Sequence, residues 1–298
     1  MKRKTEISEL IFKILAYTFL TIFAVCCLYP FVYAISSAIS GREFVDNNDI
    51  ILLPKGLQFE AFKVVLNDNS FWVSYSNTLF LTFFGTIFSM FVAILGGYAL
   101  SKKRLMFRRG FNFFLVFTMW FSAGVVPQYL NYVQTDKVFE AIGIHDTKWL
   151  VVIAMGMAAM NIILLRNAFE GVPSEVEEAA VVDGATEVQV LTKVYIPMSK
   201  STIATVALFF GISRWNGYYW ARTMMAGESF QWPLQVYIRI FLESNIWNTE
   251  QVPDLDLAYS DTSIMYAMVI CAIIPIIIIY PYIQKYFAKG VNMGGVKE

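Results

Sequence analysis

Residues 177–200 read EEAAVVDGATEVQVLTKVYIPMSK, the most polar long run in a strongly apolar chain. Glycine can adopt the left-handed backbone conformation that ends a helix, so we expect a first helix to stop at Asp183-Gly184. Proline cannot continue a helical hydrogen-bond ladder, so we expect a second helix to stop at Pro197. The stretch therefore predicts two short helices joined by a tight turn.

Both predicted helices begin with a capping signal. Ser174 and Glu177 have the spacing at which a hydroxyl and a carboxylate accept hydrogen bonds from free backbone N–H groups. Thr186 and Gln189 repeat this spacing after the turn. Capped helix starts favour a rigid hairpin over a flexible loop.

The composition of the whole chain is typical of a membrane protein. Of its 298 residues, 57% are hydrophobic and only 15% are charged, which is far from the balance of a soluble domain. A formal net charge of zero provides no basic surface, so nucleic acid is not an expected partner. Cys26, Cys27 and Cys271 lie in apolar runs, and His145 lacks ligand spacing, so no metal site is expected.

Six runs are long and apolar enough to cross a bilayer as helices, which requires about 20 residues each. They cover about residues 10–36, 71–100, 111–133, 149–165, 202–220 and 263–287. The first run is too long for a signal peptide, so we expect an uncleaved span. The expected fold is all-α, a polytopic membrane protein with six transmembrane helices. Without a repeat or linker, residues 1–298 are expected to form a single integral-membrane domain.

Lysine and arginine residues set the expected orientation in the membrane. They gather before the first span and between the second and third spans, and such clusters stay on the cytoplasmic side. Alternation of the spans then places residues 167–200 in the cytoplasm. Both termini are expected to be cytoplasmic as well.

The side chains of the hairpin suit a surface that docks against another protein. Ala179 and Ala180 are small enough to let a partner approach the backbone closely, and several acidic groups offer handles for basic partner residues. Val188, Leu191 and Tyr195 fall at helical spacing and are expected to form one apolar face that enters a groove. The alternative is a solvated connector whose apolar residues only touch neighbouring spans.

The hairpin resembles the EAA loop of ABC-importer permeases, which reads EAA, three residues, Gly, nine residues and Ile-x-Leu-Pro. The matching residues are Glu178, Ala179, Ala180, Gly184 and Pro197. Val194 and Ile196 replace the Ile and Leu of that pattern, which are mild changes in volume. PSEVEEAAVVDGAT, GGYALSKKRLMFRR and the tail KGVNMGGVKE are similar to the carbohydrate-uptake branch of the maltose type.

This resemblance implies the type I ABC importer permease fold and a location in the bacterial plasma (inner) membrane. The hairpin would be a cytoplasmic EAA coupling hairpin that sits in a cleft of a separate ATPase subunit. The implied coupling residues are Glu177, Glu178, Ala179, Ala180, Asp183, Gly184 and Pro197. The chain would form the translocation pathway for a sugar by alternating access, and it would not be an enzyme. A permease for an amino acid or phosphate is the nearest alternative, and a channel is a more distant one.

The resemblance also implies several partners. These are a second homologous permease subunit, two ATPase subunits, an extracytoplasmic solute-binding protein and membrane lipid. The chain lacks the G-x-x-x-x-G-K-[ST] phosphate-binding loop, so we expect it to bind no cofactor itself. ATP and Mg are expected on the ATPase subunits.

The fifth predicted span contains GISRWNGYYWAR, residues 211–222, which is rich in groups that can contact a sugar. A charged Arg214 is costly in lipid, so it should face the bundle interior, a water-filled path or the interface, and we favour the pathway. Trp215, Asn216, Tyr219 and Trp220 offer flat rings and a hydrogen-bonding amide. The alternative for the aromatic residues is a belt at the headgroup level. Asn77 is a weaker pathway candidate, since an interhelical hydrogen bond explains it equally well.

Overall fold

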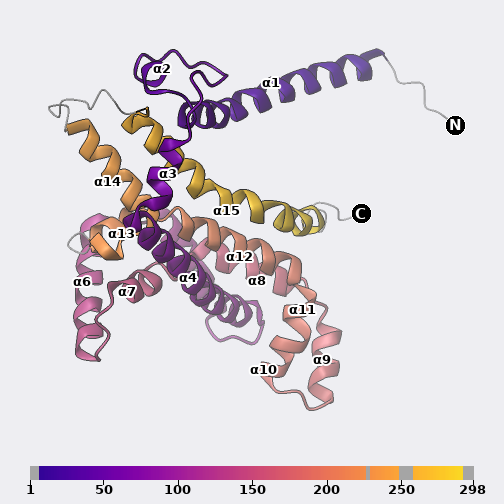
Figure 1. Ribbon diagram of the computed structural model, residues 1–298. Coiled ribbons are helices and arrows are strands. Elements are labelled where there is room, and N and C mark those ends of the chain that lie inside the picture. The colour runs from indigo at the N-terminus through magenta and orange to yellow at the C-terminus, as the bar shows by residue number, and fades with distance from the viewer. Residues whose placement is uncertain (1–6, 226–228, 248–257, 291–298) are drawn as a thin grey trace. The chain divides into compact units, whose positions relative to one another are not determined.

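The computed structural model describes residues 7–225, 229–247 and 258–290, and this part of the chain contains helices and no strand (Figure 1). Three helices are long and apolar enough to cross a membrane. They are α1 (Ile7–Ala38), α4 (Asn69–Ser101) and α15 (Asp261–Gly290). These helices match the first, second and sixth predicted spans. The expectation of an all-α membrane protein is therefore confirmed.

Three further spans appear only if two helices joined at a bend are counted together. The pairs are α5 (Arg108–Trp120) with α6 (Val125–Ala141), bent by 114°, α7 (Thr147–Ala154) with α8 (Ala159–Glu170), bent by 53°, and Glu187–Met198 with α12 (Lys200–Trp215), bent by 87°. Counted in this way, the described residues hold up to six spans. Each of the predicted runs 111–133, 149–165 and 202–220 contains a break between two helices.

Glycine contributes to the breaks in the third and fourth spans. Gly124 precedes α6 with a φ of 89°, a left-handed conformation that other residues rarely adopt. Gly156 lies between α7 and α8, where an added Cβ would be 2.4 Å from the ring of Phe88. The fifth run breaks after Trp215, and the short helix α13 (Tyr219–Met224) follows. These positions interrupt helices that composition alone would continue.

The chain divides into two compact units. Unit 1 comprises Met1–Phe71 and Ile238–Ile274, and unit 2 comprises Trp72–Tyr237 and Pro275–Glu298. The boundaries fall inside α4, α14 (Leu234–Trp247) and α15 rather than in linkers. A single integral domain over residues 1–298 stays a prediction.

In unit 1, a buried glutamine organises the segment that follows α1. Gln58 donates hydrogen bonds through Nε2 to the carbonyl oxygens of Ala38 and Ser40, at 3.2 and 3.0 Å, and its Oε1 accepts one from the backbone of Ala61 at 3.1 Å. These bonds tie the end of α1 to α3 (Glu60–Asn67), while α2 (Arg42–Asp46) lies between them in the chain. The most apolar part of α1 is not buried by the described residues. Lipid or another protein must cover it.

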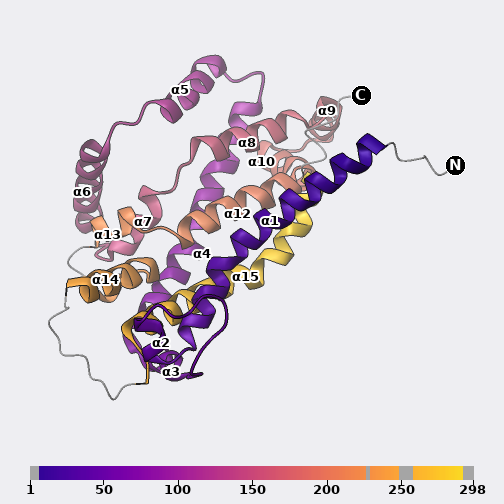
Figure 2. The same ribbon diagram turned by 90° about the horizontal axis from the view of Figure 1, so that it is seen from above.

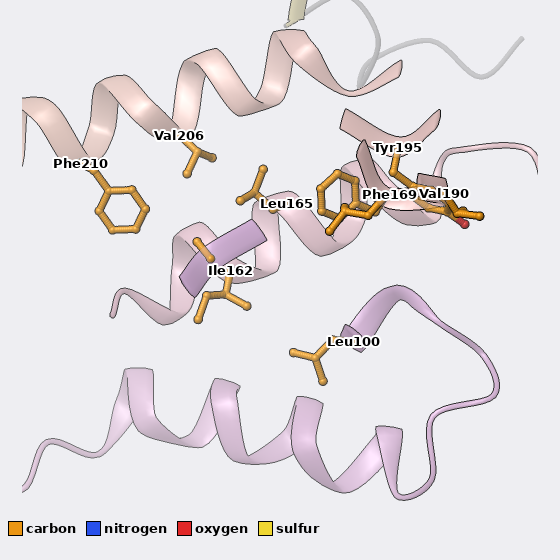
Figure 3. Close-up of a cluster of buried hydrophobic side chains, with 10 residues drawn as sticks. Leu100, Ile162, Leu165, Phe169, Val190, Tyr195, Val206 and Phe210 are labelled. Atoms are coloured by element: carbon orange, nitrogen blue, oxygen red, sulfur yellow. The ribbon is translucent and has the colours of Figure 1, made fainter. Parts of the chain in front are cut away.

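In unit 2, one hydrophobic cluster joins α4, α8, α12 and the segment 190–195 (Figure 3). Its buried members are Ala93, Leu100, Ile162, Leu165, Phe169, Val190, Leu191, Tyr195, Val206 and Phe210. Helices α8 and α12 run side by side in both views (Figures 1 and 2). Gly97 lets α4 approach α8 closely, since a Cβ there would lie 3.0 Å from the Leu165 side chain. The cluster thus connects the spans directly to the polar hairpin.

Candidate functional site

The predicted hairpin is present in residues 174–198. Helix α9 (Ser174–Val182) ends at a turn in which Gly184 has a φ of 81°. The N–H of Gly184 donates to the carbonyl of Val181 at 3.0 Å, and the N–H of Ala185 donates to that of Ala180 at 2.9 Å. This pair of bonds is the Schellman arrangement that satisfies carbonyls at a helix end. The predicted turn at Asp183-Gly184 is confirmed.

The two predicted capping boxes have different outcomes. Thr186 and Gln189 form one at the start of α10 (Glu187–Val190), with reciprocal side-chain to backbone bonds of 2.8 and 3.4 Å. The box predicted for Ser174 and Glu177 was wrong, because no side chain caps the start of α9. The carboxylate of Glu177 instead accepts a hydrogen bond from Lys102, a charged donor that forms a stronger bond than a backbone N–H.

The expectation that Pro197 ends the second helix was also wrong. After α10 the chain continues through a π-helical segment, Leu191–Tyr195, and α11 (Ile196–Met198), and the path changes direction only at Ser199. Proline lacks the N–H for an α-helical bond, and its ring crowds the carbonyl four residues earlier. A π-helical segment just before Pro197 changes the local bonding pattern and lets the helical path continue.

The predicted apolar face of the second helix is not a face presented to a partner. Leu191 and Tyr195 are buried in the hydrophobic cluster of their own chain, whereas Val188 is 69% exposed. The hairpin also has exposed apolar side chains directly before its turn, where Val181 is 49% and Val182 86% exposed. Sequence reasoning missed this tip, although the VV pair directly before Asp-Gly is the signal that indicates it.

The predicted coupling residues divide into two groups by exposure. Most of them lie at the surface, namely Glu178, Ala179, Asp183, Gly184 and Pro197. Ala180 is half-buried and packs against the hydrophobic cluster, and Glu177 is half-buried beside Lys102. The adjacent carboxylates Glu177 and Glu178 therefore have different environments, one facing its own chain and one facing outward.

The carboxylate of Glu177 has two donors. Lys102 Nζ lies 2.6 Å from Oε1, and the hydroxyl of Tyr195 donates to Oε2. Burial alone would raise the pKa of Glu177, but the hydrogen bonds from Lys102 and Tyr195 outweigh it and lower that pKa. The pKa of the Tyr195 hydroxyl is raised, mainly by burial and in second place by its hydrogen bond to Glu177. At neutral pH this carboxylate is therefore ionised and paired.

A groove of about 1060 Å³ opens beside the hairpin. Its walls come from the end of α4 and the following loop on one side and from the end of α8 and the start of α9 on the other. The charged lining residues include Lys102, Lys103, Arg104, Glu170, Glu175 and Glu178. Both signs of charge line the groove.

Arg214 is only 5% exposed and makes three hydrogen bonds within its own chain. Its Nη1 donates to the carbonyl of Val151 at 2.9 Å, and its Nη2 donates to the carbonyl of Val152 and to Ser89 Oγ, each at 3.0 Å. The two carbonyls lie in the last turn of α7, and that of Val151 also accepts a hydrogen bond from the N–H of Met155 at 3.3 Å. The expectation that Arg214 faces the bundle interior is met, and its role in a solute pathway stays a prediction.

The other pathway candidates fall in different environments. Asn77 is buried and donates to the carbonyls of Phe230 and Trp232, at 2.8 and 3.2 Å, so a backbone partner accounts for it. Trp215 is buried, with its ring edge-on to another aromatic ring. Asn216 and Tyr219 are exposed, and Trp220 is half-buried. Among the described residues, no three His, Cys, Asp or Glu side chains could hold a metal ion.

The chain is similar along its length to proteins of one kind. Residues 7–293 match the family described as binding-protein-dependent transport system inner membrane component. The polygalacturonan/rhamnogalacturonan transport system permease protein YtcP of Bacillus subtilis is 32% identical, covering 96% of this chain and 98% of that protein. The maltodextrin transport system permease protein MdxG of Bacillus subtilis is 26% identical, covering 96% of each.

Two solved structures share the fold. One, from a bacterial ABC transporter involved in the import of the acidic polysaccharide alginate, is 40% identical, with a TM-score of 0.84, covering 96% of this chain and all of that chain. A chain of the alginate ABC transporter in complex with its alginate pentasaccharide-bound periplasmic protein is 15% identical, with a TM-score of 0.60, covering 94% of this chain and 96% of that chain, and shows the fold alone. The predictions of a type I importer permease fold and of a permease rather than an enzyme are confirmed. The chain belongs to the family of binding-protein-dependent transport system inner membrane components.

Proposed function

We propose that this chain is the membrane-spanning subunit of an ABC importer that carries a saccharide inward. The observation that carries the proposal is the capped hairpin, whose turn and outer carboxylate are exposed while its inner side is fixed to the spans. A rigid element with one free face and one anchored face is suited to transmit displacement. In an importer the displacement comes from ATP binding and hydrolysis in a separate subunit.

The proposed coupling contact involves the outer side of α9 and the turn. Glu178 and Asp183 supply negative charge, Ala179 allows close approach, and Val181 and Val182 supply apolar area. An acidic and apolar tip fits a partner groove with an apolar floor and basic rim. Gly184 sets the direction of the turn, and Pro197 lies in the return segment.

The proposed substrate is a poly- or oligosaccharide. Two of the relatives with extended similarity are named for polygalacturonan/rhamnogalacturonan and for maltodextrin transport, and the 40% identical solved structure comes from a transporter of alginate. These names favour a carbohydrate over an amino acid or phosphate. The substrate pathway would be completed by a second homologous permease subunit, and an extracytoplasmic solute-binding protein would deliver the sugar.

In the proposed arrangement, the hairpin and both termini lie in the cytoplasm, and transport proceeds by alternating access. Two ATPase subunits would hold ATP and Mg, and this chain would bind neither. Breaks in three spans support a route through unit 2, because a broken helix in a membrane is tolerated where its free backbone groups meet protein or water.

The proposal predicts that Glu178→Lys abolishes docking of the ATPase. The complex is purified through a tag on this chain after co-expression with its ATPase and second permease subunit, and bound ATPase is measured. We expect about a tenfold or greater loss, because a lysine would repel the basic rim that Glu178 contacts. Glu175→Lys is the matched control, since Glu175 is an exposed carboxylate of the same helix outside the coupling set. Equal ATPase recovery from both variants would contradict the proposal.

A further inference from the structure

Both arms of the hairpin are held by the same end of one helix. Glu177 on α9 is paired with Lys102, which directly follows α4. Glu187, the first residue of α10, accepts a hydrogen bond of 2.8 Å from the hydroxyl of Tyr98 in α4. Arg104 forms an ion pair with the same Glu187 carboxylate. One short stretch, residues 98–104, thus contacts the hairpin on either side of its turn.

Lys102 occupies an unusual environment for a lysine. Its side chain is 9% exposed, and its ammonium lies 4.3 Å from the ring centre of Tyr98 and 4.0 Å from that of Tyr195. A cation between two aromatic rings is attracted by both ring faces. A buried ammonium is costly without a counter-ion, and Glu177 is the carboxylate that supplies one here. Loss of Glu177 would leave a buried ammonium without its counter-ion, and loss of Lys102 would remove the cation paired with a half-buried carboxylate.

The two tyrosines connect the two carboxylates. Tyr195 donates to Glu177 and Tyr98 donates to Glu187, and the two rings meet edge-on with their centres 5.1 Å apart. The pKa of Glu187 is lowered by a hydrogen bond from Tyr98, the larger cause, and by one from Arg104. This carboxylate is therefore also ionised at neutral pH. The contacts form one connected network rather than separate surface pairs.

Hydrophobic packing alone does not fix the first arm. The first arm is α9, and none of its residues, Ser174–Val182, is fully buried. The second arm, which follows the turn, contributes Val190, Leu191 and Tyr195 to the hydrophobic cluster. The pair Lys102–Glu177 is therefore a principal link between α9 and the spans. Glu177 is also the direct neighbour of Glu178, where the proposed ATPase contact would apply force.

We propose that Lys102 is a positioning residue for energy coupling. With Tyr98, Arg104, Glu177, Glu187 and Tyr195 it forms what we name the α4 clamp, which makes the hairpin and the end of α4 move as one body. This inference rests on the proposed function, because it assigns the clamp to the path between the ATPase and the membrane. Without the clamp, α9 would move relative to α4 when the ATPase displaces it, and the displacement would not be passed on to α4.

The test measures whether α9 and α4 keep a fixed separation in the complete complex. Cys26, Cys27 and Cys271 are replaced by serine, and spin labels are attached at Glu175→Cys on α9 and Phe91→Cys on α4, two exposed positions outside the clamp. The distance distribution between the labels is recorded by pulsed electron resonance with and without ATP and Mg. When all clamp residues are intact, we expect one narrow distribution of label distances, both with and without ATP and Mg.

Lys102→Met and Glu177→Gln should each broaden the distribution, by roughly twofold or more, because each removes the ion pair between α9 and the end of α4. The double variant should be no broader than the worse single variant, since both changes remove one interaction. Lys103→Met, an exposed neighbour, is the matched control and should leave the width unchanged. Unchanged widths in the clamp variants, or additive effects in the double variant, would overturn the proposal.

ATPase recovery separates this inference from the proposed function. Lys102→Met leaves every predicted coupling residue intact, so we expect this variant to co-purify the ATPase at the unaltered level. If the complex with the intact clamp recovers no ATPase, the proposed function fails. If ATPase is recovered and the distance stays narrow in Lys102→Met, only the clamp fails.

Discussion

The side chain of Arg214 donates to carbonyls at the end of a broken helix. Two of its hydrogen bonds reach the carbonyls of Val151 and Val152 in the last turn of α7, and a positive charge is favoured at that end of a helix. The guanidinium also presses against Gly85 of α4, where an added Cβ would lie 2.9 Å from Nε. Arg214 therefore braces three helices, α4, α7 and α12, at one point.

Arg214→Lys should lower the thermal stability of the purified complex, because a lysine cannot reproduce the planar fork of donors. Each hydrogen bond to a charged group contributes about 1.5–3 kcal/mol, so the loss should be clearly measurable by thermal unfolding in detergent. Arg239→Lys on α14 is the control, since Arg239 is exposed and bonds only to Glu243 in the described structure. Normal stability with altered sugar uptake would instead support the pathway role of Arg214.

Single residues differ in how well the sequence reveals them. Gly184 was predictable, because a left-handed turn requires glycine whatever surrounds it. The role of Glu177 was not, because a local capping spacing competes with a lysine 75 positions earlier in the chain. Local rules identify residues whose constraint is local, whereas pairings between distant segments depend on the folded arrangement.

The hairpin depends on its turn as a whole element. Gly184 is free of steric contact at its missing Cβ but has a φ of 81°, so the requirement for glycine comes from the backbone conformation. The Schellman bonds at Ala180 and Val181 depend on that conformation. Changing the turn would therefore reorient α10 relative to α9.

Gly184→Val should distort the turn and reduce ATPase recovery several-fold while the chain still inserts. A residue with a Cβ in the left-handed region costs roughly 1–2 kcal/mol, and a branched side chain increases that cost. Gly171→Ala is the control, because Gly171 has a φ of −78°, which alanine adopts readily. ATPase recovery and membrane level are both measured by quantitative blotting. Full recovery from Gly184→Val would exclude a role for the turn geometry in docking.

The second arm shows why element boundaries were harder to predict than element existence. The capping box at Thr186 was correct, but a strict α-helical period assigned Val188, Leu191 and Tyr195 to one face. The π-helical segment 191–195 changes the rotation per residue, so a regular period does not continue into it. Composition gives no direct signal for such a segment.

Over the molecule as a whole, the number of apolar runs was readable from sequence and their continuity was not. Hydropathy averages over a window, so it identified α1, α4 and α15 with bounds that differ by a few residues. The breaks at residues 121–124 and 155–158 are set by close contacts and backbone conformation. A short interruption changes the window average little, which is why the bent pairs appeared as continuous spans.

Six spans with cytoplasmic ends predict that tags on both termini are protected in intact cells. Protease added outside should leave an N-terminal and a C-terminal tag uncut, because the positive residues near the first span stay inside. A tag inserted between Leu52 and Leu53, an exposed site in the first outer link, should be cleaved and serves as the control. Cleavage of either terminal tag while the membrane is intact would contradict the six-span topology.

The brace at Arg214 has a consequence for biosynthesis. The carbonyls of Val151 and Val152 receive their guanidinium partner from a residue 62 or 63 positions further along the chain. A nascent polypeptide leaves the ribosome in order, so the fourth hydrophobic segment enters the insertion machinery before that partner has been translated. Its hydrogen bonds to Arg214 can therefore form only after the fifth segment has been made.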